Sequence, residues 1–133
     1  AMTRGKITID KTNPYHLAAV IAKLEESGCE VDVNGDSITL TMEHAPKPTD
    51  ITTAPYPGFP TDLQAQWMAY MLTAEGTSSI TDTIYTDRFK HVPELLRLGA
   101  DVEMAENTAI IKGGKKLSGA TVMSTDLRAS ASL

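Results

Sequence analysis

LEESGCEVDVNGDSITL (residues 24–40) and LLRLGADVEMAENTAII (residues 95–111) follow one pattern, and this pattern decides the fold. Each stretch closes a run of apolar residues at helical spacing, stops at a glycine, and continues as two short alternating stretches joined by a turn. Each copy then leads to Thr-Asp-Leu-Xaa-Ala, at Thr61 and again at Thr125. Because both registers agree, the sequence predicts a duplicated α/β unit whose copies share one core.

Turn and cap residues predict the remaining elements. Asn13-Pro14 is typical of an N-cap followed by proline in the first helical turn, and Asn34-Gly35 is typical of a type I′ hairpin turn. Thr61 is expected to cap a helix that runs to about Glu75 and has one apolar face. We further expect strands near residues 6–9, 51–53, 77–81 and 120–123, a turn at Glu106-Asn107, and helices before Gly99 and from Thr125 onward.

Composition bounds the class of protein. The 133 residues, with a formal net charge of −5 and a pI of about 5.1, predict one acidic domain and argue against a nucleic-acid-binding module, which needs a basic face. The longest purely apolar run, residues 17–22, is far too short to span a bilayer. We therefore expect a soluble, cytoplasmic protein. The last expected helix has little room before Leu133, so we also expect the chain to be part of a larger protein.

Two acids and one arginine at expected helix starts are candidates for chemistry. Asp62 and Asp126 each follow a threonine there, where an acid offsets the positive end of the helix, so a purely structural role suffices for both. A role as general base would require burial or a bound anion to oppose the helix dipole. Arg128 lies where a cation is disfavoured, so it either binds an anion beside the helix N–H groups or pairs with Asp126.

Other polar residues give weaker indications. Asp87 is most simply a helix cap, and Arg88 is either a solvated charge or a second anion ligand. Cys29 alternates with polar neighbours on an expected strand, so it is expected to be a buried structural thiol. As the single cysteine of the sequence, it also excludes a disulfide framework and a multi-cysteine zinc site. The histidines (His16, His44 and His91) lack metal-ligand spacing and are expected on the surface, so no metal site is predicted.

Three blocks of the chain resemble the bacterial UDP-N-acetylglucosamine 1-carboxyvinyltransferase family of enolpyruvyl transferases. These are PGFPTDLQAQ (residues 57–66), DRFKHVPELLRLGA (residues 87–100) and KKLSGATVMSTDLRASASL (residues 115–133), and the similarity covers nearly the whole chain. The resemblance implies an inside-out α/β barrel, in which three βαβαββ units form each of two domains. Residues 1–133 would then form a single partial domain of about two tandem units, roughly 6–80 and 81–133, without the other catalytic domain.

The resemblance also implies an activity. Members of this family transfer the enolpyruvyl group of phosphoenolpyruvate to the 3-hydroxyl of UDP-N-acetylglucosamine and release phosphate, in the first committed step of peptidoglycan synthesis and so of cell wall biogenesis, cell shape and division. The reaction is cytoplasmic and uses no metal or organic cofactor, and neither a nucleic acid nor a membrane is implied as a partner. The isolated chain is predicted to be inactive, and self-association is open. The alternative is a non-catalytic α/β repeat module that acts in binding or assembly.

Several residues take roles from the resemblance alone. Asp62 matches the carboxylate proposed to remove the proton from the sugar 3-hydroxyl. Ile84 matches a position whose backbone contacts the sugar nucleotide, Tyr85 matches an aromatic residue near the substrate, and Arg88 matches an arginine of the cleft. Asp126 and Arg128 match catalytic residues at the phosphoenolpyruvate end, where Arg128 would help to hold anionic groups. Cys29 does not match the family's reactive cysteine, which lies on the other domain.

Overall fold

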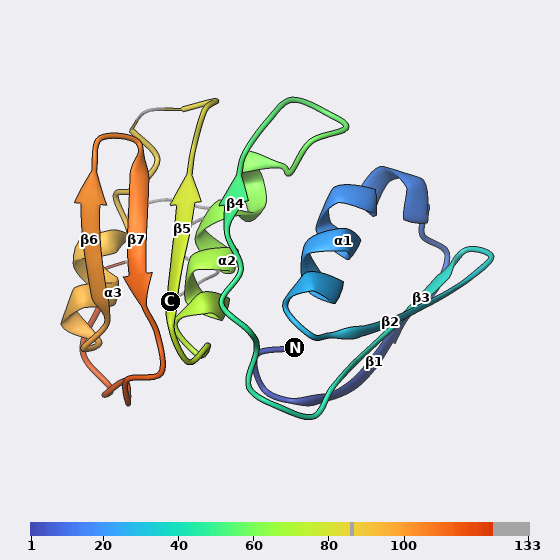
Figure 1. Cartoon of the computed structure of the whole chain (residues 1–133), viewed down its shortest axis with the longest axis horizontal. Coiled ribbons are helices and arrows are strands. Elements are labelled where there is room, and N and C mark those ends of the chain that lie inside the picture. Colours follow the sequence, from blue (N-terminus) through green and yellow to red (C-terminus); the bar gives the residue numbers. More distant parts are fainter. Residues whose placement is uncertain (86, 124–133) are drawn as a thin grey trace.

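Two β-sheets and three α-helices make up the chain in a computed structural model that describes residues 1–85 and 87–123 (Figure 1). The sequence-based expectation of an α/β fold is confirmed. In chain order the elements are β1 (Gly5–Ile9), the 3-10 turn η1 (Pro14–Leu17), α1 (Ala18–Glu26), β2 (Glu30–Asn34), β3 (Ser37–Met42), β4 (Ile51–Thr52), the 3-10 turn η2 (Thr61–Leu63), α2 (Gln64–Met71), β5 (Thr77–Thr81), α3 (Val92–Arg97), β6 (Asp101–Ala105) and β7 (Thr108–Lys112).

The first sheet, called here the N-terminal sheet, has the antiparallel strand order β1-β3-β2. The Asn13 side chain accepts a hydrogen bond from the backbone N–H of Tyr15, which confirms the predicted N-cap, at the start of η1, the 3-10 turn that leads into α1. The predicted hairpin turn is wrong by one residue. Asn34 pairs with Ser37, so Gly35 and Asp36 are the two central residues, and of these only Gly35 has a positive φ, +62°. Glycine at the first central position is typical of a type II′ turn.

The second sheet, called here the C-terminal sheet, has the order β4-β5-β7-β6. β4 is parallel to β5, and the other pairs are antiparallel. The predicted turn between β6 and β7 is confirmed, because Ala105 pairs with Thr108 around Glu106, whose φ is +53°. Within this sheet β5, β7 and β6 have the same order as β1, β3 and β2 have in the N-terminal sheet.

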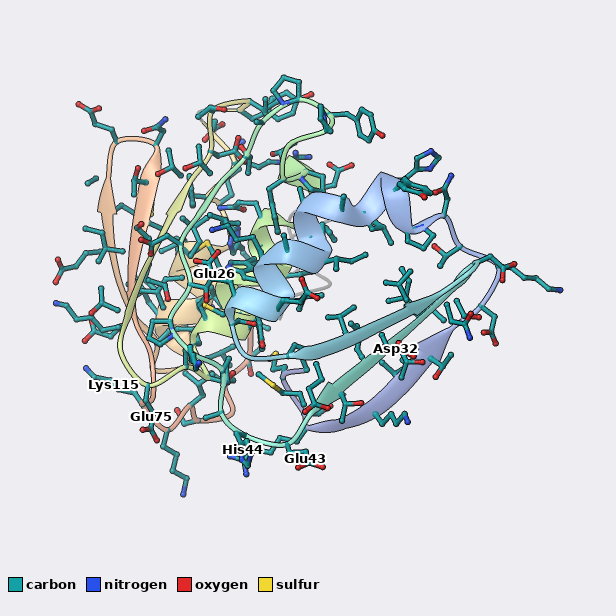
Figure 2. All side chains as sticks on the ribbon, turned by 45° about the vertical axis from the view of Figure 1, so that its right-hand side comes forward. Glu26, Asp32, Glu43, His44, Glu75 and Lys115 are labelled. Atoms are coloured by element: carbon teal, nitrogen blue, oxygen red, sulfur yellow. The ribbon has the colours of Figure 1, made fainter. Side chains whose placement is uncertain are left out.

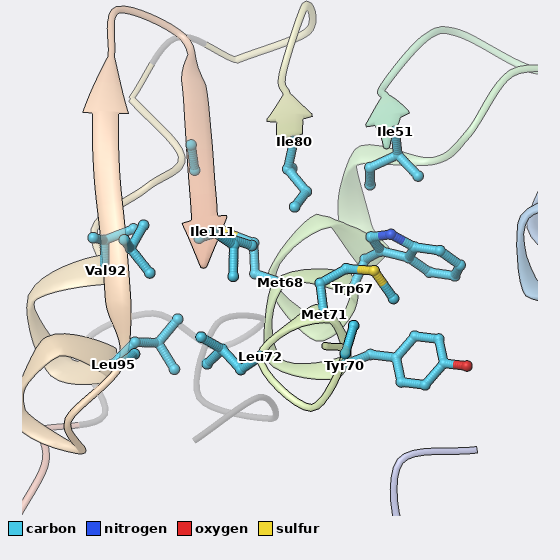
Figure 3. Close-up of a cluster of buried hydrophobic side chains, with 14 of the residues drawn as sticks. Ile51, Trp67, Met68, Tyr70, Met71, Leu72, Ile80, Val92, Leu95 and Ile111 are labelled. Atoms are coloured by element: carbon cyan, nitrogen blue, oxygen red, sulfur yellow. The ribbon is translucent and has the colours of Figure 1, made fainter. Parts of the chain in front are cut away.

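Helix α2 forms the centre of the core. The sequence predicts one apolar face, but seven of its eight residues are buried, including Gln64 and Ala69. The physical reason is its position between two partners, since it contacts both the C-terminal sheet and α1. Figure 3 shows Met68 and Met71 of α2 beside Ile80 and Ile111 of that sheet. The helix also ends at Met71, earlier than the predicted Glu75.

The segment after β7 runs alongside α3 and forms no strand within the described residues. Residues 113–123 contain no helix or strand, so the strand predicted near residues 120–123 is wrong. Its backbone groups bond to α3 and the residue after it. Ser118 N–H donates to the Leu98 carbonyl at 2.8 Å, and Met123 N–H donates to the Glu94 carboxylate at 3.0 Å. The helix expected from Thr125 lies outside the described residues.

Candidate functional site

A buried carboxylate at the end of β5 organises the polar region of the C-terminal sheet. Asp82 directly follows the strand and is 0% exposed. Its Oδ1 atom accepts three hydrogen bonds of 2.9 Å, from the Thr53 hydroxyl and from the backbone N–H groups of Ile84 and Tyr85. Its Oδ2 atom accepts the Thr61 hydroxyl at 2.6 Å. One side chain therefore joins the end of β4, the start of η2 and the loop after β5.

These hydrogen bonds decide the ionisation of Asp82. Burial by itself would raise the pKa of this carboxyl, because it penalises the charged form. The donors from Thr61, Tyr85, Ile84 and Thr53 act in the opposite direction and together outweigh burial, so the pKa of Asp82 lies below its ordinary value. Asp82 is therefore a buried negative charge at neutral pH.

Arg88 lies beside Thr61, which is hydrogen-bonded to Asp82, and its guanidinium links these buried groups to the exposed Asp62. Its Nη1 atom donates to the Thr61 hydroxyl at 2.6 Å, and its Nη2 atom donates to Oδ1 of Asp62 at 2.9 Å. Its guanidinium carbon lies 4.7 Å from the centre of the Tyr85 ring, which is cation–π contact. The Arg88 side chain is 16% exposed, whereas that of Asp62 is 61% exposed. The structure thus presents an accessible carboxylate next to a largely covered cation.

The structure brings together four of the residues that the sequence selected: Asp62, Ile84, Tyr85 and Arg88. Of the two readings of Arg88, a free solvated charge is excluded by its ion pair with Asp62. Asp126 and Arg128, which were predicted at the phosphoenolpyruvate end, lie outside the described residues.

Two predicted helix caps are wrong. The Thr61 hydroxyl makes no capping bond, because it donates to Asp82 and accepts from Arg88. Asp87 pairs with Lys90 at 2.8 Å, whereas His91 holds the N-cap position of α3 without a side-chain capping bond. Tertiary partners therefore take the Thr61 hydroxyl, and a lysine three residues further along the chain takes the Asp87 carboxylate.

The structure also tests the predictions for the cysteine and the histidines. Cys29 is 4% exposed, and burial raises the pKa of its thiol, which confirms the structural reading. His16 and His44 are exposed as predicted, and Figure 2 shows His44 beside Glu43 at the edge of the molecule. The prediction for His91 is wrong: its ring is 1% exposed because Met68 of α2 covers it, with Nε2 at 3.1 Å from the Met68 sulfur.

Asp62 and Arg88 do not line the apolar hollow between the helices. This hollow of about 220 Å³ lies between α1 and α2, and its lining includes Val20, Leu24 and Trp67. Among residues 1–85 and 87–123, the structure places no three His, Cys, Asp or Glu side chains where they would hold a metal ion. In the same ranges no helix is long and apolar enough to cross a bilayer.

Such an arrangement can carry two kinds of chemistry. An accessible carboxylate can accept a proton from a ligand hydroxyl, and a guanidinium can bind a phosphate or carboxylate. Thr53, Thr61 and Asp82, which build this arrangement, were not selected as functional residues by sequence reasoning. The available signal was an acid directly after the Thr77–Thr81 strand, where edge-of-sheet sites form.

Comparison with known proteins decides the family. The model of the EPSP synthase (3-phosphoshikimate 1-carboxyvinyltransferase) family matches residues 1–133. The chain belongs to this family. Within it, the chain is 54% identical over 133 residues to a UDP-N-acetylglucosamine 1-carboxyvinyltransferase of Chlorobium chlorochromatii (strain CaD3), a match that covers 100% of the chain and 31% of that protein. A relative of the same name from Shewanella sp. (strain ANA-3) is 55% identical over 134 residues, covering 100% of the chain and 32% of that protein. The resemblance seen in the sequence is confirmed, and the chain spans about a third of the length of these relatives.

Solved structures agree on the fold. The enolpyruvyl transferase NikO from Streptomyces tendae superposes with a TM-score of 0.74 at 27% identity, over 87% of the chain and 27% of that protein. An EPSP synthase from Acinetobacter baumannii superposes with a TM-score of 0.70 at 13% identity, over 96% of the chain and 32% of that protein. The second likeness bears on the fold alone.

Proposed function

We propose that this chain supplies one wall of the cleft of an enolpyruvyl transferase that joins phosphoenolpyruvate to UDP-N-acetylglucosamine. The observation that carries the proposal is 54% identity, along the whole chain, to a protein named for this reaction. The Asp62–Arg88 pair adds a chemical reason, because it sets a proton acceptor beside an anion-binding group. The product would enter peptidoglycan synthesis, and thus cell wall biogenesis, in the cytoplasm.

In this proposal Asp62 is the general base. It takes the proton of the sugar 3-hydroxyl while that oxygen bonds to C2 of phosphoenolpyruvate and C3 takes a proton from a general acid on the other domain. In the resulting tetrahedral adduct a base removes a proton from C3 as the bond between C2 and the phosphate oxygen breaks, which restores the double bond, releases phosphate and leaves the enolpyruvyl ether. The exposure of Asp62, 61% of the side chain, supports this role because a substrate hydroxyl can reach it.

Other residues would hold the substrates. Arg88 would bind an anionic part of the sugar nucleotide, and the Ile84 backbone and Tyr85 ring would line its path. Asp126 and Arg128 would complete the phosphoenolpyruvate end, where charge develops in the adduct. The hydrogen bonds from the Ile84 and Tyr85 N–H groups to Asp82 support this arrangement, because they fix the loop that carries both residues.

We also propose the finer architecture. The described residues would contain one complete βαβαββ unit, β4-α2-β5-α3-β6-β7, preceded by the β1-α1-β2-β3 part of another, in an inside-out barrel whose other domain closes the cleft. The unit limits would therefore differ from the expected 6–80 and 81–133. The matching orders β1-β3-β2 and β5-β7-β6 and the buried helix α2 support this architecture. A non-catalytic module has less support, because relatives at 53–55% identity carry an enzyme's name.

A ligand titration tests the binding wall. We expect UDP-N-acetylglucosamine, added to the ¹⁵N-labelled chain to concentrations that saturate weak binding, to shift the backbone amide signals of Asp62, Ile84, Tyr85 and Arg88. The R88A variant should weaken these shifts. Signals that stay unchanged at these positions, or that move only on β6 and β7, would contradict the proposal. Phosphate release from the two substrates by the isolated chain would contradict the missing-domain part of it.

A further inference from the structure

The Arg88 guanidinium needs a partner that its visible ion pair does not fully provide. Its side chain is 16% exposed, so it has lost much of its hydration, and a cation in such a place requires compensation. Asp62 contributes little of this, because that side chain is 61% exposed and its charge is screened by water. The nearest fully buried anion is Asp82, which is one hydroxyl group away.

The Thr61 hydroxyl connects the two charges in one direction only. Arg88 Nη1 donates to Thr61 Oγ1 at 2.6 Å, and Thr61 Oγ1 in turn donates to Asp82 Oδ2 at 2.6 Å. Because a guanidinium cannot accept and an ionised carboxylate cannot donate, the polarity of this chain of hydrogen bonds is fixed. Both bonds are charge-assisted, which makes them stronger than bonds between neutral groups.

Asp82 is itself held from several directions. Thr53 and the N–H groups of Ile84 and Tyr85 fix Oδ1, and the Asn107 side chain donates to the Asp82 carbonyl at 3.1 Å. A carboxylate with this many fixed donors cannot rotate to follow a mobile arginine. It can only impose its own position.

From this geometry we infer that Asp82 is a positioning residue that acts through Thr61 to fix the Arg88 guanidinium, and through Arg88 the Asp62 carboxylate. Asp10 shows the contrast, because it follows β1 as Asp82 follows β5 but accepts a hydrogen bond from Ser37 on the exposed surface. The orientation of Arg88 rests on the contacts alone, whereas its consequence for substrate binding rests on the proposed function.

Four variants of the full 133-residue chain test this inference. D82N keeps an acceptor for Thr53 and the backbone N–H groups but places an NH₂ donor opposite Thr61. T61V removes the connecting hydroxyl and leaves Asp82 in place, while T61S restores that hydroxyl. D10N removes the corresponding acid of the N-terminal sheet and is the control.

The measurement is the ¹⁵N NMR spectrum of the Arg88 guanidinium, which reports hindered rotation and slow hydrogen exchange of this group. A spectrum of the backbone amides shows whether each variant is folded. We expect hindered rotation in the parent chain, T61S and D10N, and free rotation in T61V and in folded D82N. If D82N fails to fold, T61V decides the question. Unchanged Arg88 signals in T61V, or the same loss in D10N, would overturn the inference.

A binding measurement separates this inference from the proposed function. With UDP-N-acetylglucosamine we expect T61V to bind about ten-fold more weakly and T61S to bind as the parent does. If the Arg88 guanidinium rotates freely in T61V but neither the parent chain nor any variant binds the ligand, the proposed function is refuted and the positioning role of Asp82 stands. Ligand binding that is equal in T61V and T61S would refute the substrate part of the inference.

Discussion

Three strands of the C-terminal sheet, β5-β7-β6, repeat the order of the N-terminal sheet, β1-β3-β2, but the two sets differ in burial. In β1 every residue is exposed, and α1 has no fully buried residue. In β5 and β7 alternate residues are buried, and α2 is buried almost throughout. Figure 1 shows why: α2 lies between the C-terminal sheet and α1, whereas the N-terminal sheet lies at the end of the molecule away from the C-terminal sheet. Similar local sequence therefore gives similar elements, and their neighbours decide which of them becomes core.

The two regions also differ in the burial of a matching acid: Asp10 follows β1, and Asp82 follows β5. Asp10 makes a surface hydrogen bond with Ser37, while Asp82 is enclosed by donors from three segments. Only the enclosed acid can organise a site, because a buried charge needs fixed partners and so fixes them in turn.

The largest expected difference between the regions concerns two leucines in matching positions. Leu95 of α3 is 1% exposed, whereas Leu24 of α1 is partly buried. We expect L95A to lower the free energy of unfolding by about 2–5 kcal/mol, because it leaves a cavity that the core cannot close. L24A should cost about 1 kcal/mol, since less apolar surface is involved. Urea denaturation of both variants measures the two losses, and equal losses would break the comparison.

A smaller effect should appear on acidification. The pKa of Asp82 is lowered in the folded chain, so its contribution to stability is present above the ordinary value of 3.8 and is lost as the pH falls through the lowered value. We expect the free energy of unfolding to fall less steeply in D82N than in the parent chain between about pH 4 and pH 2. D10N controls for the loss of one charge. If the free energy of unfolding fell with pH equally steeply in D82N and in the parent, the donors would not lower the pKa of Asp82.

The smallest effect concerns one hydrogen bond that joins the two regions. The Ser27 hydroxyl donates to the Leu24 carbonyl at 2.7 Å, so the Tyr70 hydroxyl must donate to Ser27, at 2.9 Å. We expect Y70F to cost about 1 kcal/mol, the usual value of one buried hydrogen bond.

The same residue predicts a response to alkali. Burial raises the pKa of Tyr70, so its contribution holds below the ordinary value of 10.0 and is lost as the pH rises toward the raised value. Unfolding curves at neutral and alkaline pH check this. A Y70F variant that loses stability with alkali as steeply as the parent would contradict it.

Local sequence was sufficient for most elements. The N-cap at Asn13, the glycines that end α1 and α3, and the turn around Glu106 follow from the conformational needs of single residues. The hairpin after β2 was missed by one position, because Gly35 suits two turn types and only the strand pairing chooses between them.

The candidate site was predicted only in part. Asp62 and Arg88 were selected from the sequence pattern and given roles by family resemblance, but the Asp82 carboxylate beside them was not selected. The donors to Asp82 include Thr53 and Thr61, which are 29 and 21 residues away in the chain, and no local pattern brings them together. The burial of His91 was missed for the same reason, since its cover is Met68 of another helix.

One measurement tests the central claim most directly. The chain would replace the matching segment of the Shewanella sp. (strain ANA-3) relative, which is 55% identical over 134 residues, and phosphate release from phosphoenolpyruvate and UDP-N-acetylglucosamine would be assayed. We predict that this hybrid is active, that D62N lowers its kcat by about 10²- to 10⁴-fold because the general base is lost, and that D10N leaves it unchanged. A folded hybrid without activity, or a D62N hybrid as fast as the parent, would contradict the assignment of Asp62 to this cleft.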